Sequence, residues 1–509
     1  MTVGPCFLCS AETSLVCPHC GDWVCGDQHY QYHRRLTARE AGDSPVPAGS
    51  ELFPDKLCQP FKLIHGDKGR YLVATRDISP LETVLTDQPS VVGPPAVTAP
   101  VCLECLTPLC SVEAGVVECS LCSAPLCGRA ECEGGPNHEA ECRLLQEAGT
   151  RLHIKDYSAT NIFYSAVLPL RMWSTRDRDS MLWAKINFLQ EEKEDQLAGA
   201  RMFTDVADYI HTRLGLTEIR TEEVLRLTGI KAVNAIDLSQ VGVEGTALYG
   251  VYPLMNSYCY CNTMYHIDPA TKVMKVRAKT AIKAGEEITT RYVVPSMEQP
   301  ARLEHIWRVW GFICSCARCQ SASELGSFYS GVRCGGCQAG TFLPSTSDRL
   351  GSDWTCGDCG ASTSEENILN ILARCRAIRD RLESQDPAQG EDLLTQLTNY
   401  LHPNHGLCVE QKAKLVVNYS KLTDKPAAVL DRQLQLATDV IQVMDIIDPG
   451  LTPRRGGMLK YIVDIRMKKA NKDKDDGLID KVEHMRRMKS NMMLMKEMMM
   501  CLKYSVVLT

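Results

Sequence analysis

The sequence has no apolar stretch of the roughly 20 residues that a membrane-spanning helix needs. Its first residues, MTVGPCFLCS, show no basic segment leading into an apolar run, so we expect no secretory signal. A strong charge of one sign is also missing, because the net charge is only -6. We therefore expect a protein of the cytoplasm and nucleus that binds no membrane and does not bind nucleic acid directly.

The composition shows no bias toward disorder. Hydrophobic residues make up 44% and charged residues 23% of the chain, as in ordinary globular proteins. A length of 509 residues leaves room for roughly three or four domains. We expect packed domains with sizeable cores.

Cysteine is abundant, with 26 residues, most of them in CxxC pairs. Without a secretory signal we expect no oxidising compartment, so these pairs indicate thiolate ligands for zinc rather than disulfides. The first cluster offers seven ligands, whereas two zinc ions need eight. Either the second site takes Cys58, Asp43 or a water, or only one metal is tightly held. The seven candidate ligands are Cys6, Cys9, Cys17, Cys20, Cys25, His29 and His33.

The second cluster has eight ligands in the order CxxC, CxxC, C, C, H, C, which predicts two zinc ions in a cross-braced finger. Cys110 is left over and is expected to be a buried thiol. One metal would bind Cys102, Cys105, Cys127 and Cys132, and the other Cys119, Cys122, His138 and Cys142.

Two more clusters follow. Cys314, Cys316 and Cys319 are one ligand short of a tetrahedral site, and either Cys259 or Cys261 is the natural fourth. The last set has the spacing of a zinc ribbon. Its ligands are Cys334, Cys337, Cys356 and Cys359.

The apolar pattern predicts an α+β fold. Residues 61–92 alternate apolar and polar side chains, which indicates short antiparallel strands, whereas residues 145–230 have helical spacing. Strands resume near Ala232, and a capping box at Thr363 and Glu366 opens a series of helices. The tail from Lys468 is basic and then rich in methionine, typical of a helix that packs in the protein or contacts a partner helix or an acidic surface.

The order of these parts resembles the SET and MYND domain (SMYD) family, and the additional N-terminal finger and later ribbon resemble its arthropod-type branch. The resemblance covers about residues 52–465 and is carried by KGRY at 68–71, the inserted finger, NSYCYCN at 256–262, GEEITTRY at 285–292 and CSCARC at 314–319.

The resemblance implies a β-rich SET core that is interrupted by a MYND-like zinc finger and a helical insert, with an additional N-terminal zinc finger and an all-helical C-terminal domain. The implied parts are an N-terminal zinc finger (1–45), the first part of the SET domain (52–100), a MYND-type finger (102–142), a helical insert (145–230), the SET core (231–295), a post-SET zinc motif (296–320), a zinc-ribbon-like insert (330–362) and a helical C-terminal domain with the basic, methionine-rich tail (363–509).

The resemblance also implies a protein-lysine N-methyltransferase that uses S-adenosylmethionine, is monomeric, and acts on histone or other proteins in transcriptional regulation. Its cofactor pocket would lie on one face and the channel for the substrate lysine on the other. Carried over residue by residue, the first cofactor loop corresponds to Lys68, Gly69 and Arg70, and further cofactor contacts correspond to Asn234, Asn256 and Ser257. Tyr292 matches the catalytic tyrosine of the methyl-transfer pore, and Trp310 and Phe312 match the aromatic wall of that pore. Cys259 matches the fourth post-SET ligand.

The chemistry accounts for these residue types. Methyl transfer from a sulfonium is an in-line displacement, so catalysis comes mostly from alignment, with a tyrosine hydroxyl to polarise the methyl group and orient the amine. The attacking lysine must be neutral, although its reference pKa is about 10.4, so a desolvated, positively charged site favours its deprotonation.

Three positions depart from the family pattern: Tyr71 stands where the family has Gly, Ser257 where it has His, and Cys261 where it has Pro. They keep a second hypothesis open, namely a catalytically inactive adaptor. In that case the MYND-like finger would bind a proline-containing peptide and the helical domain would recruit protein partners.

Overall fold

The computed structural model describes residues 4–5, 12–14, 60–66, 69–96, 98–111, 116–154, 159–191, 200–337, 339–347, 350–423 and 425–503. The seven candidate ligands of the N-terminal cluster lie outside these residues, as do Asp43, Cys58 and Lys68. Of the N-terminal segment, the structure describes a short antiparallel pair, β1 (Gly4–Pro5) with β2 (Glu12–Thr13).

The centre of the molecule is built from three small antiparallel sheets, ordered β13-β4-β3, β11-β12-β5 and β6-β10-β9. Each sheet joins strands from before and after the second cysteine cluster, so the two predicted strand regions form one body. The strands are β3 (Phe61–Gly66), β4 (Gly69–Ala74), β5 (Thr83–Asp87), β6 (Pro89–Gly93), β9 (Ala235–Asp237), β10 (Thr246–Tyr249), β11 (Thr263–Ile267), β12 (Met274–Ala278) and β13 (Glu287–Ile288).

Alternation of side chains places one face of these strands in the core. On β12, Met274, Val276 and Ala278 are buried, whereas Lys275 and Arg277 between them are half-buried and lie on the opposite face. This pleat gives the sheet an apolar side and a basic side.

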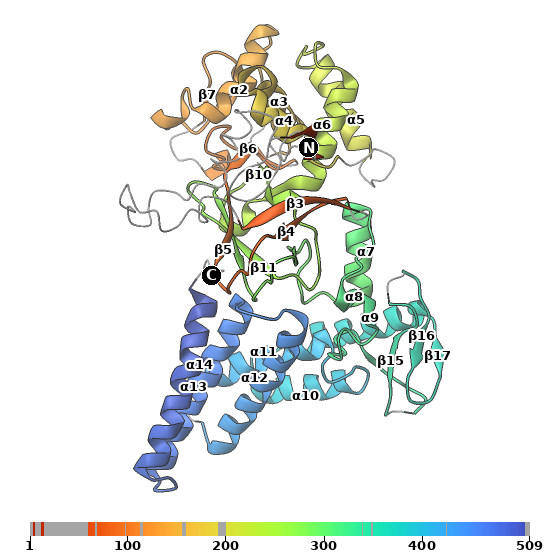
Figure 1. Cartoon of the computed structure of the whole chain (residues 1–509), viewed down its shortest axis with the longest axis vertical. Helices are drawn as coiled ribbons and strands as arrows, with labels where there is room; N and C mark the ends of the chain where they lie inside the picture. The colour runs from red at the N-terminus through yellow and green to blue at the C-terminus, as the bar shows by residue number, and fades with distance from the viewer. Residues whose placement is uncertain are drawn as a thin grey trace.

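A group of helices covers one end of this body (Figure 1). Most of α3 is buried on all sides and forms the centre of the main core. The strands resume at Ala235 rather than Ala232, because α6 continues to Asn234. The helices are α2 (Pro136–Glu147), α3 (Phe163–Arg178), α4 (Ser180–Asn187), α5 (Ala200–Thr212) and α6 (Thr221–Asn234).

The inserted finger ends within α2, which carries the ligands His138 and Cys142, and also contains β7 (Val117–Glu118), β8 (Pro125–Leu126) and two short 3-10 turns, η2 (Leu109–Ser111) and η3 (Ala130–Cys132). The prediction of a buried Cys110 is wrong, because this thiol is exposed. In η2 the neighbouring Leu109 occupies the buried position instead.

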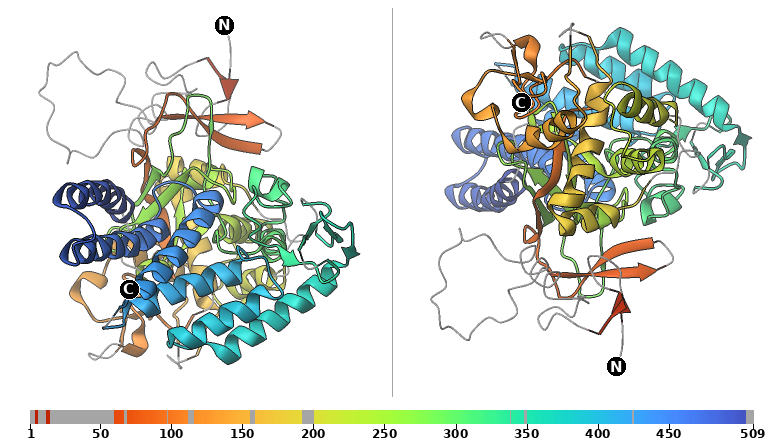
Figure 2. Two further views of the ribbon diagram at one scale, coloured as in Figure 1. Left: turned by 90° about the horizontal axis from the view of Figure 1, so that it is seen from below. Right: turned by 90° about the horizontal axis from the view of Figure 1, so that it is seen from above.

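A second group of helices covers the opposite end, and a small sheet ordered β14-β15-β16-β17 projects beside it (Figures 1 and 2). These elements are α7 (Gln299–Trp310), α8 (Ala317–Gln320), β14 (Val332–Arg333), β15 (Thr341–Pro344), β16 (Trp354–Cys356), β17 (Ser362–Thr363), α9 (Glu365–Leu382), α10 (Pro387–Thr398), α11 (Gly406–Ser420), α12 (Ala427–Ile447), α13 (Pro453–Asp475) and α14 (Lys481–Leu502).

Two details at this end of the molecule differ from the predictions made from the sequence or add to them. The cap of α9 is Ser364, whose side chain accepts a hydrogen bond from the Asn367 amide, rather than the predicted Thr363, which belongs to β17. The methionine-rich tail forms α14, which packs on α13 and leaves Met492 and Met493 exposed. Among the helices that the structure describes, none is long and apolar enough to cross a bilayer.

Candidate cofactor cavity and metal centres

A cavity of about 480 Å³ lies where six separate segments of the chain meet. Every predicted cofactor residue that the structure describes lines it, although these residues are up to 243 positions apart, from Gly69 to Phe312. The sequence motifs did not predict the other half of the residues that line this cavity. The predicted residues are Gly69, Arg70, Asn234, Asn256, Ser257, Tyr292, Trp310 and Phe312, and the missed ones are Gln190, Val233, Pro253, Leu254, Tyr258, Ile313, Cys314 and Ser315.

The first wall is the start of β4. Gly69 has φ +80°, a left-handed conformation that favours glycine. The next residue, Arg70, lies with its guanidinium 4.2 Å from the centre of the Phe188 ring and donates a hydrogen bond to the Phe188 carbonyl. Burial lowers the pKa of Arg70. The cavity therefore has one cationic wall that is held in place by a ring and a carbonyl.

The second wall is the end of α6, where Asn234 is buried. Its side-chain nitrogen donates to the carbonyl oxygens of Gln190 and Ile230, each at 2.7 Å. Because the amide hydrogens are used inside the protein, the side-chain oxygen is the group that Asn234 can offer to a ligand. Gln190 gave no motif in the sequence, since it contributes through its backbone.

The third wall is the segment after β10. The side chains of Asn256 and Tyr258 both donate to the carboxylate of Glu287, at 2.6 and 2.9 Å. Glu287 belongs to β13, so this carboxylate ties the segment to the sheet that carries Gly69 and Arg70. Glu287 therefore holds two residues of the cavity wall in place.

Tyr292 is positioned from both of its ends. Its backbone N–H donates to the side-chain oxygen of Ser257 at 3.1 Å, and its ring lies 5.0 Å from that of Trp310. Burial raises the pKa of Tyr292 to about 12. The phenol therefore stays protonated at neutral pH and can donate or accept a hydrogen bond without carrying charge.

Tyr292 also borders a second cavity, of about 390 Å³. Its lining includes residues of β11 and β12 and residues around the junction of α12 and α13. Tyr292 is the residue that lines both cavities. The two spaces thus approach each other at Tyr292.

Two of the three departures from the family pattern do not line the first cavity. Tyr71 is not among the described residues that line this cavity. Its ring lies against Gly66, because a Cβ added to Gly66 would come within 3.1 Å of the Tyr71 ring. Cys261 is buried and its thiol donates to the Thr263 carbonyl at 3.3 Å. The third, Ser257, lines the cavity and positions Tyr292.

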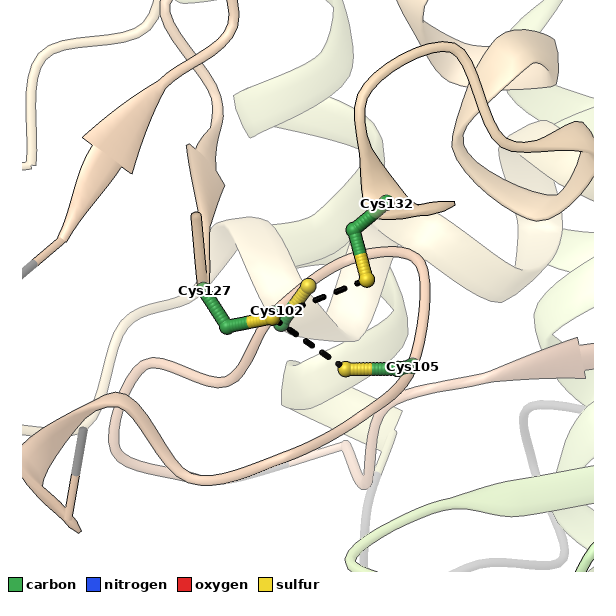
Figure 3. Close-up of side chains that lie close together, drawn as sticks. All are labelled: Cys102, Cys105, Cys127 and Cys132. Carbon is green, nitrogen blue, oxygen red and sulfur yellow. Dashed lines mark hydrogen bonds between the residues drawn. The ribbon is translucent and has the colours of Figure 1, made fainter. Parts of the chain in front are cut away.

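Four groups of cysteine and histidine side chains each bring four ligand atoms within 4.8 Å of one another. They match the four predicted sets in the described part of the chain, and Cys259 rather than Cys261 completes the third. Figure 3 shows the first group, whose four thiols point toward a common centre. The groups are Cys102, Cys105, Cys127 and Cys132; Cys119, Cys122, His138 and Cys142; Cys259, Cys314, Cys316 and Cys319; and Cys334, Cys337, Cys356 and Cys359.

The spacing of these ligand atoms fits zinc. A tetrahedral zinc with Zn–S bonds of about 2.3 Å holds two sulfurs about 3.8 Å apart. The sulfur of Cys127 lies 3.6 Å from those of Cys105 and Cys132. In the last group Cys337 and Cys356 are 3.9 Å apart. Such separations are far longer than a disulfide bond of about 2.05 Å. Each group is therefore able to hold a zinc ion, with no position left for a reacting molecule.

The third group is connected directly to the first cavity, because Cys314 is part of both. The buried guanidinium of Arg302 lies 3.6 Å from the Cys319 sulfur and 2.9 Å from the carboxylate of Glu324. Although burial would raise the pKa of Glu324, Arg318 and Arg302 hold it below its usual range. This arrangement of charges suits four thiolates around a divalent cation, which together are negative.

The second group shows a comparable outer contact. His138 faces Cys122 through Nε2 at 3.5 Å and Glu141 through Nδ1 at 3.1 Å. Glu141 is fully buried and pairs with Arg171 of α3. A carboxylate behind a ligand histidine fixes the ring and its tautomer, as is common at zinc sites. The finger is thereby anchored to the main core.

No family model matches the chain. It is 22% identical to the histone-lysine N-methyltransferase ASHR1 of Arabidopsis thaliana over 65% of this chain and 70% of that protein. It is 26% identical to the SET domain-containing protein SmydA-8, isoform B, of Drosophila melanogaster over 57% of this chain and 64% of that protein. The chain thus matches about two thirds of the length of these relatives.

Among solved structures, the chain is similar to Rubisco LSMT bound to AdoMet, with 14% identity over 83% of this chain and 93% of that one and a TM-score of 0.28. That score is too low to transfer any geometry, so the sites described above rest on the residues of this chain. In sequence, the chain is thus similar to a relative named as a histone-lysine N-methyltransferase and to relatives named for the SET domain, in agreement with the resemblance that the order of its motifs indicates.

Proposed function

We propose that the chain is a protein-lysine N-methyltransferase that uses S-adenosylmethionine. The observation that carries the proposal is the position of Tyr292, which lines two cavities of about 480 and 390 Å³. A methyl donor in the first cavity and a lysine in the second would meet at this residue. The relative from Arabidopsis thaliana is named as a histone-lysine N-methyltransferase, which supports the same class of reaction.

The residues that line the first cavity provide the charged, polar and aromatic groups that this cofactor needs for binding. S-adenosylmethionine, when bound, supplies an electrophilic methyl group on a positively charged sulfur. The Arg70 guanidinium suits the carboxylate of its methionine part, the Asn234 side-chain oxygen can accept from its amino group or hydroxyls, and Trp310 and Phe312 offer aromatic surface for its purine. Gly69 would contribute its backbone to the wall around the cofactor, and Ser257 would contribute a polar side chain.

The second cavity has the properties that a lysine nucleophile needs. Tyr292 remains a neutral phenol, so it orients the amine and the methyl group by hydrogen bonding instead of removing a proton. Lys275, Arg277 and Arg291 line this cavity, and their positive field favours loss of the proton from a substrate ammonium group. Alignment and a lowered amine pKa are the two contributions that the reaction requires from the protein.

The zinc groups have structural roles in this proposal. The group of Cys259, Cys314, Cys316 and Cys319 would hold the segment that contains Phe312 and Ile313 against the cavity. We also infer that residues 102–142 are a finger of the MYND type, because eight ligands form two interleaved groups there. Binding of a proline-containing peptide to it, the monomeric state and a location in cytoplasm and nucleus stay predictions.

Calorimetric titration of the zinc-loaded chain with S-adenosylmethionine tests the proposal. We expect a saturable heat with one site per chain, which weakens at least tenfold in Arg70→Ala. The matched control is Arg76→Ala, since Arg76 lies shortly after the same strand and pairs on the surface with Glu82 at 2.6 Å. An absence of heat at millimolar cofactor would favour the inactive adaptor, which no observation in the described residues supports over the enzyme.

A further inference from the structure

The second cavity is strongly basic. Among the described residues that line it, four are arginine or lysine and only one, Asp448, is acidic. The chain as a whole carries a net charge of -6, so this concentration of positive charge is local. The four cations are Lys275, Arg277, Arg291 and Arg454.

The single carboxylate is already engaged within the protein. Asp448 is buried and forms an ion pair with Lys279, and its second oxygen lies 3.0 Å from Arg291. Burial would raise the pKa of Asp448, but Lys279 and Arg291 hold it below its usual range. Asp448 is therefore already paired with Lys279 and Arg291 within the protein.

The cations come from two different parts of the fold, and each part forms a section of the cavity wall. Lys275 and Arg277 are two positions apart on β12, so the pleat places them on the same face. Arg454 is at the start of α13 and is exposed. A peptide that places a lysine next to Tyr292 would have to pass along these two sections of the wall.

The pKa of His266, the residue paired with Lys275 in the sheet, is affected by the same positive charges. His266 lies on β11 and also lines the cavity. Its pKa is lowered first by burial and then by Arg277 and Lys275, while Asp268 opposes this change. At neutral pH His266 is therefore uncharged and adds no repulsion toward a lysine.

We propose that this cavity selects a target lysine whose neighbours in the substrate chain are aspartate or glutamate. The proposal rests on the function proposed above and specifies its substrate class. Acidic side chains on either side of the lysine would pair with Lys275 in one section of the wall and Arg454 in the other. The surrounding cations would at the same time favour the neutral form of the lysine itself.

A nucleic acid is the competing polyanion, and the shape of the site favours the peptide. The basic residues line a partly open cavity of about 390 Å³ that includes Tyr292 in its wall, rather than an extended surface. Such a space accepts one side chain and its immediate neighbours, whereas nucleic-acid sites follow a backbone over many phosphates.

Fluorescence anisotropy with labelled peptides tests the proposal independently of catalysis. The probes are 11-residue peptides with a central lysine flanked by glutamate, by glutamine or by arginine, titrated with the zinc-loaded full chain at low salt. We expect the glutamate peptide to bind at least tenfold more tightly than the glutamine peptide, and this preference to fall as salt is added. The arginine peptide should bind most weakly.

Charge reversal identifies the residues. Lys275→Glu and Arg454→Glu should each weaken the glutamate peptide about fivefold or more, with little effect on the glutamine peptide. The matched controls are Arg466→Glu, an exposed residue further along α13, and Lys62→Glu, an exposed residue on β3, and both should bind like the parent protein.

The outcomes separate the two proposals. Equal affinity for the glutamate and glutamine peptides, or an equal loss in the control variants, would overturn the acidic substrate class. Tighter binding of a 12-nucleotide RNA that is lost in the same two variants would overturn it as well. Methyl transfer without a preference for acidic peptides would support the methyltransferase activity and reject the proposed selectivity. A preference for acidic peptides without cofactor binding would support the selectivity and reject the methyltransferase activity.

Discussion

Lys279 at the end of β12 and Asp448 at the end of α12 form a buried ion pair that joins the strand-rich body to the C-terminal helices. Around it, the Leu451 amide donates to the Lys279 carbonyl at 2.9 Å. Gly450 has φ +95°, and a Cβ there would come within 2.2 Å of the same carbonyl. The junction beside the second cavity is therefore tightly packed.

Asp448→Asn should destabilise the folded chain by about 3 kcal/mol, because it leaves Lys279 buried without its partner charge. Since the pKa of Asp448 is lowered in the folded state, its contribution should be present above about pH 4 and be lost as the pH falls further. Urea unfolding at pH 7 measures the effect. Asp464→Asn is the control, since Asp464 pairs with Lys468 on the surface of α13. Equal stability of the two variants would contradict the prediction.

Tyr292→Phe should lower the rate of lysine methylation about 100-fold, because the hydroxyl that orients the amine is lost. Affinity for S-adenosylmethionine should change less than about twofold, since the ring that packs on Trp310 remains. Tyr419→Phe removes a hydroxyl that bonds Glu391 at 3.1 Å in the distant helices, and should keep full activity. Steady-state assays with a lysine peptide would reject the role of Tyr292 if its variant turned over normally.

Cys259→Ser and Cys359→Ser should each reduce the zinc content by one ion per chain, measured by mass spectrometry of the metal. Only Cys259→Ser should also abolish cofactor binding, because its group includes Cys314 in the cavity wall. The ribbon that contains Cys359 lies outside that wall, so its loss should leave the calorimetric signal intact. If both variants bind cofactor equally well, the proposed structural role of the third zinc group is wrong.

Glu141→Gln should weaken zinc binding in the second group by about 10- to 100-fold, because the carboxylate behind His138 is lost. Competition with a chromogenic chelator gives the affinity. On the same helix, Glu139→Gln changes an exposed residue that pairs with Arg178 at 2.7 Å, and its zinc affinity should be unaltered. An unchanged affinity in Glu141→Gln would show that the ligand set alone determines metal binding.

Lys231 on α6 gives a prediction about pH. Burial lowers its pKa from 10.5 to about 8, and its ammonium group donates to the Ser165 carbonyl at 3.1 Å. Between these two pH values the unfolded chain holds a proton that the folded chain has released, so stability should rise with pH, by about 3 kcal/mol at most. Unfolding at pH 7.5 and 9.5 should show a smaller rise in Lys231→Met than in the parent chain. The same slope in both would exclude Lys231 as its source.

Much of the site was predictable from local spacing. CxxC pairs bring two thiolates to one metal over four residues, so the spacing predicted all the ligand sets that the structure describes, apart from the choice between Cys259 and Cys261, for which the family resemblance implied Cys259. That choice depends on which of two neighbouring side chains faces Cys314, and it is Cys259 whose sulfur lies 3.8 Å away. The motifs around Gly69, Asn234 and Tyr292 likewise predicted half of the cavity wall.

The sequence by itself determined the chemistry: the thiolates, the aromatic residues, the tyrosine and the helix and strand periods that arrange them locally. Only the tertiary structure decided what depends on packing between distant segments. It placed Tyr292 in the walls of two cavities, turned the Tyr71 ring toward Gly66, brought Arg454 and Lys275 to the same cavity, and buried Asp448 against Lys279. The reason is that a cavity is the space left between elements, and its shape and charge depend on non-local contacts that no short pattern of residues records.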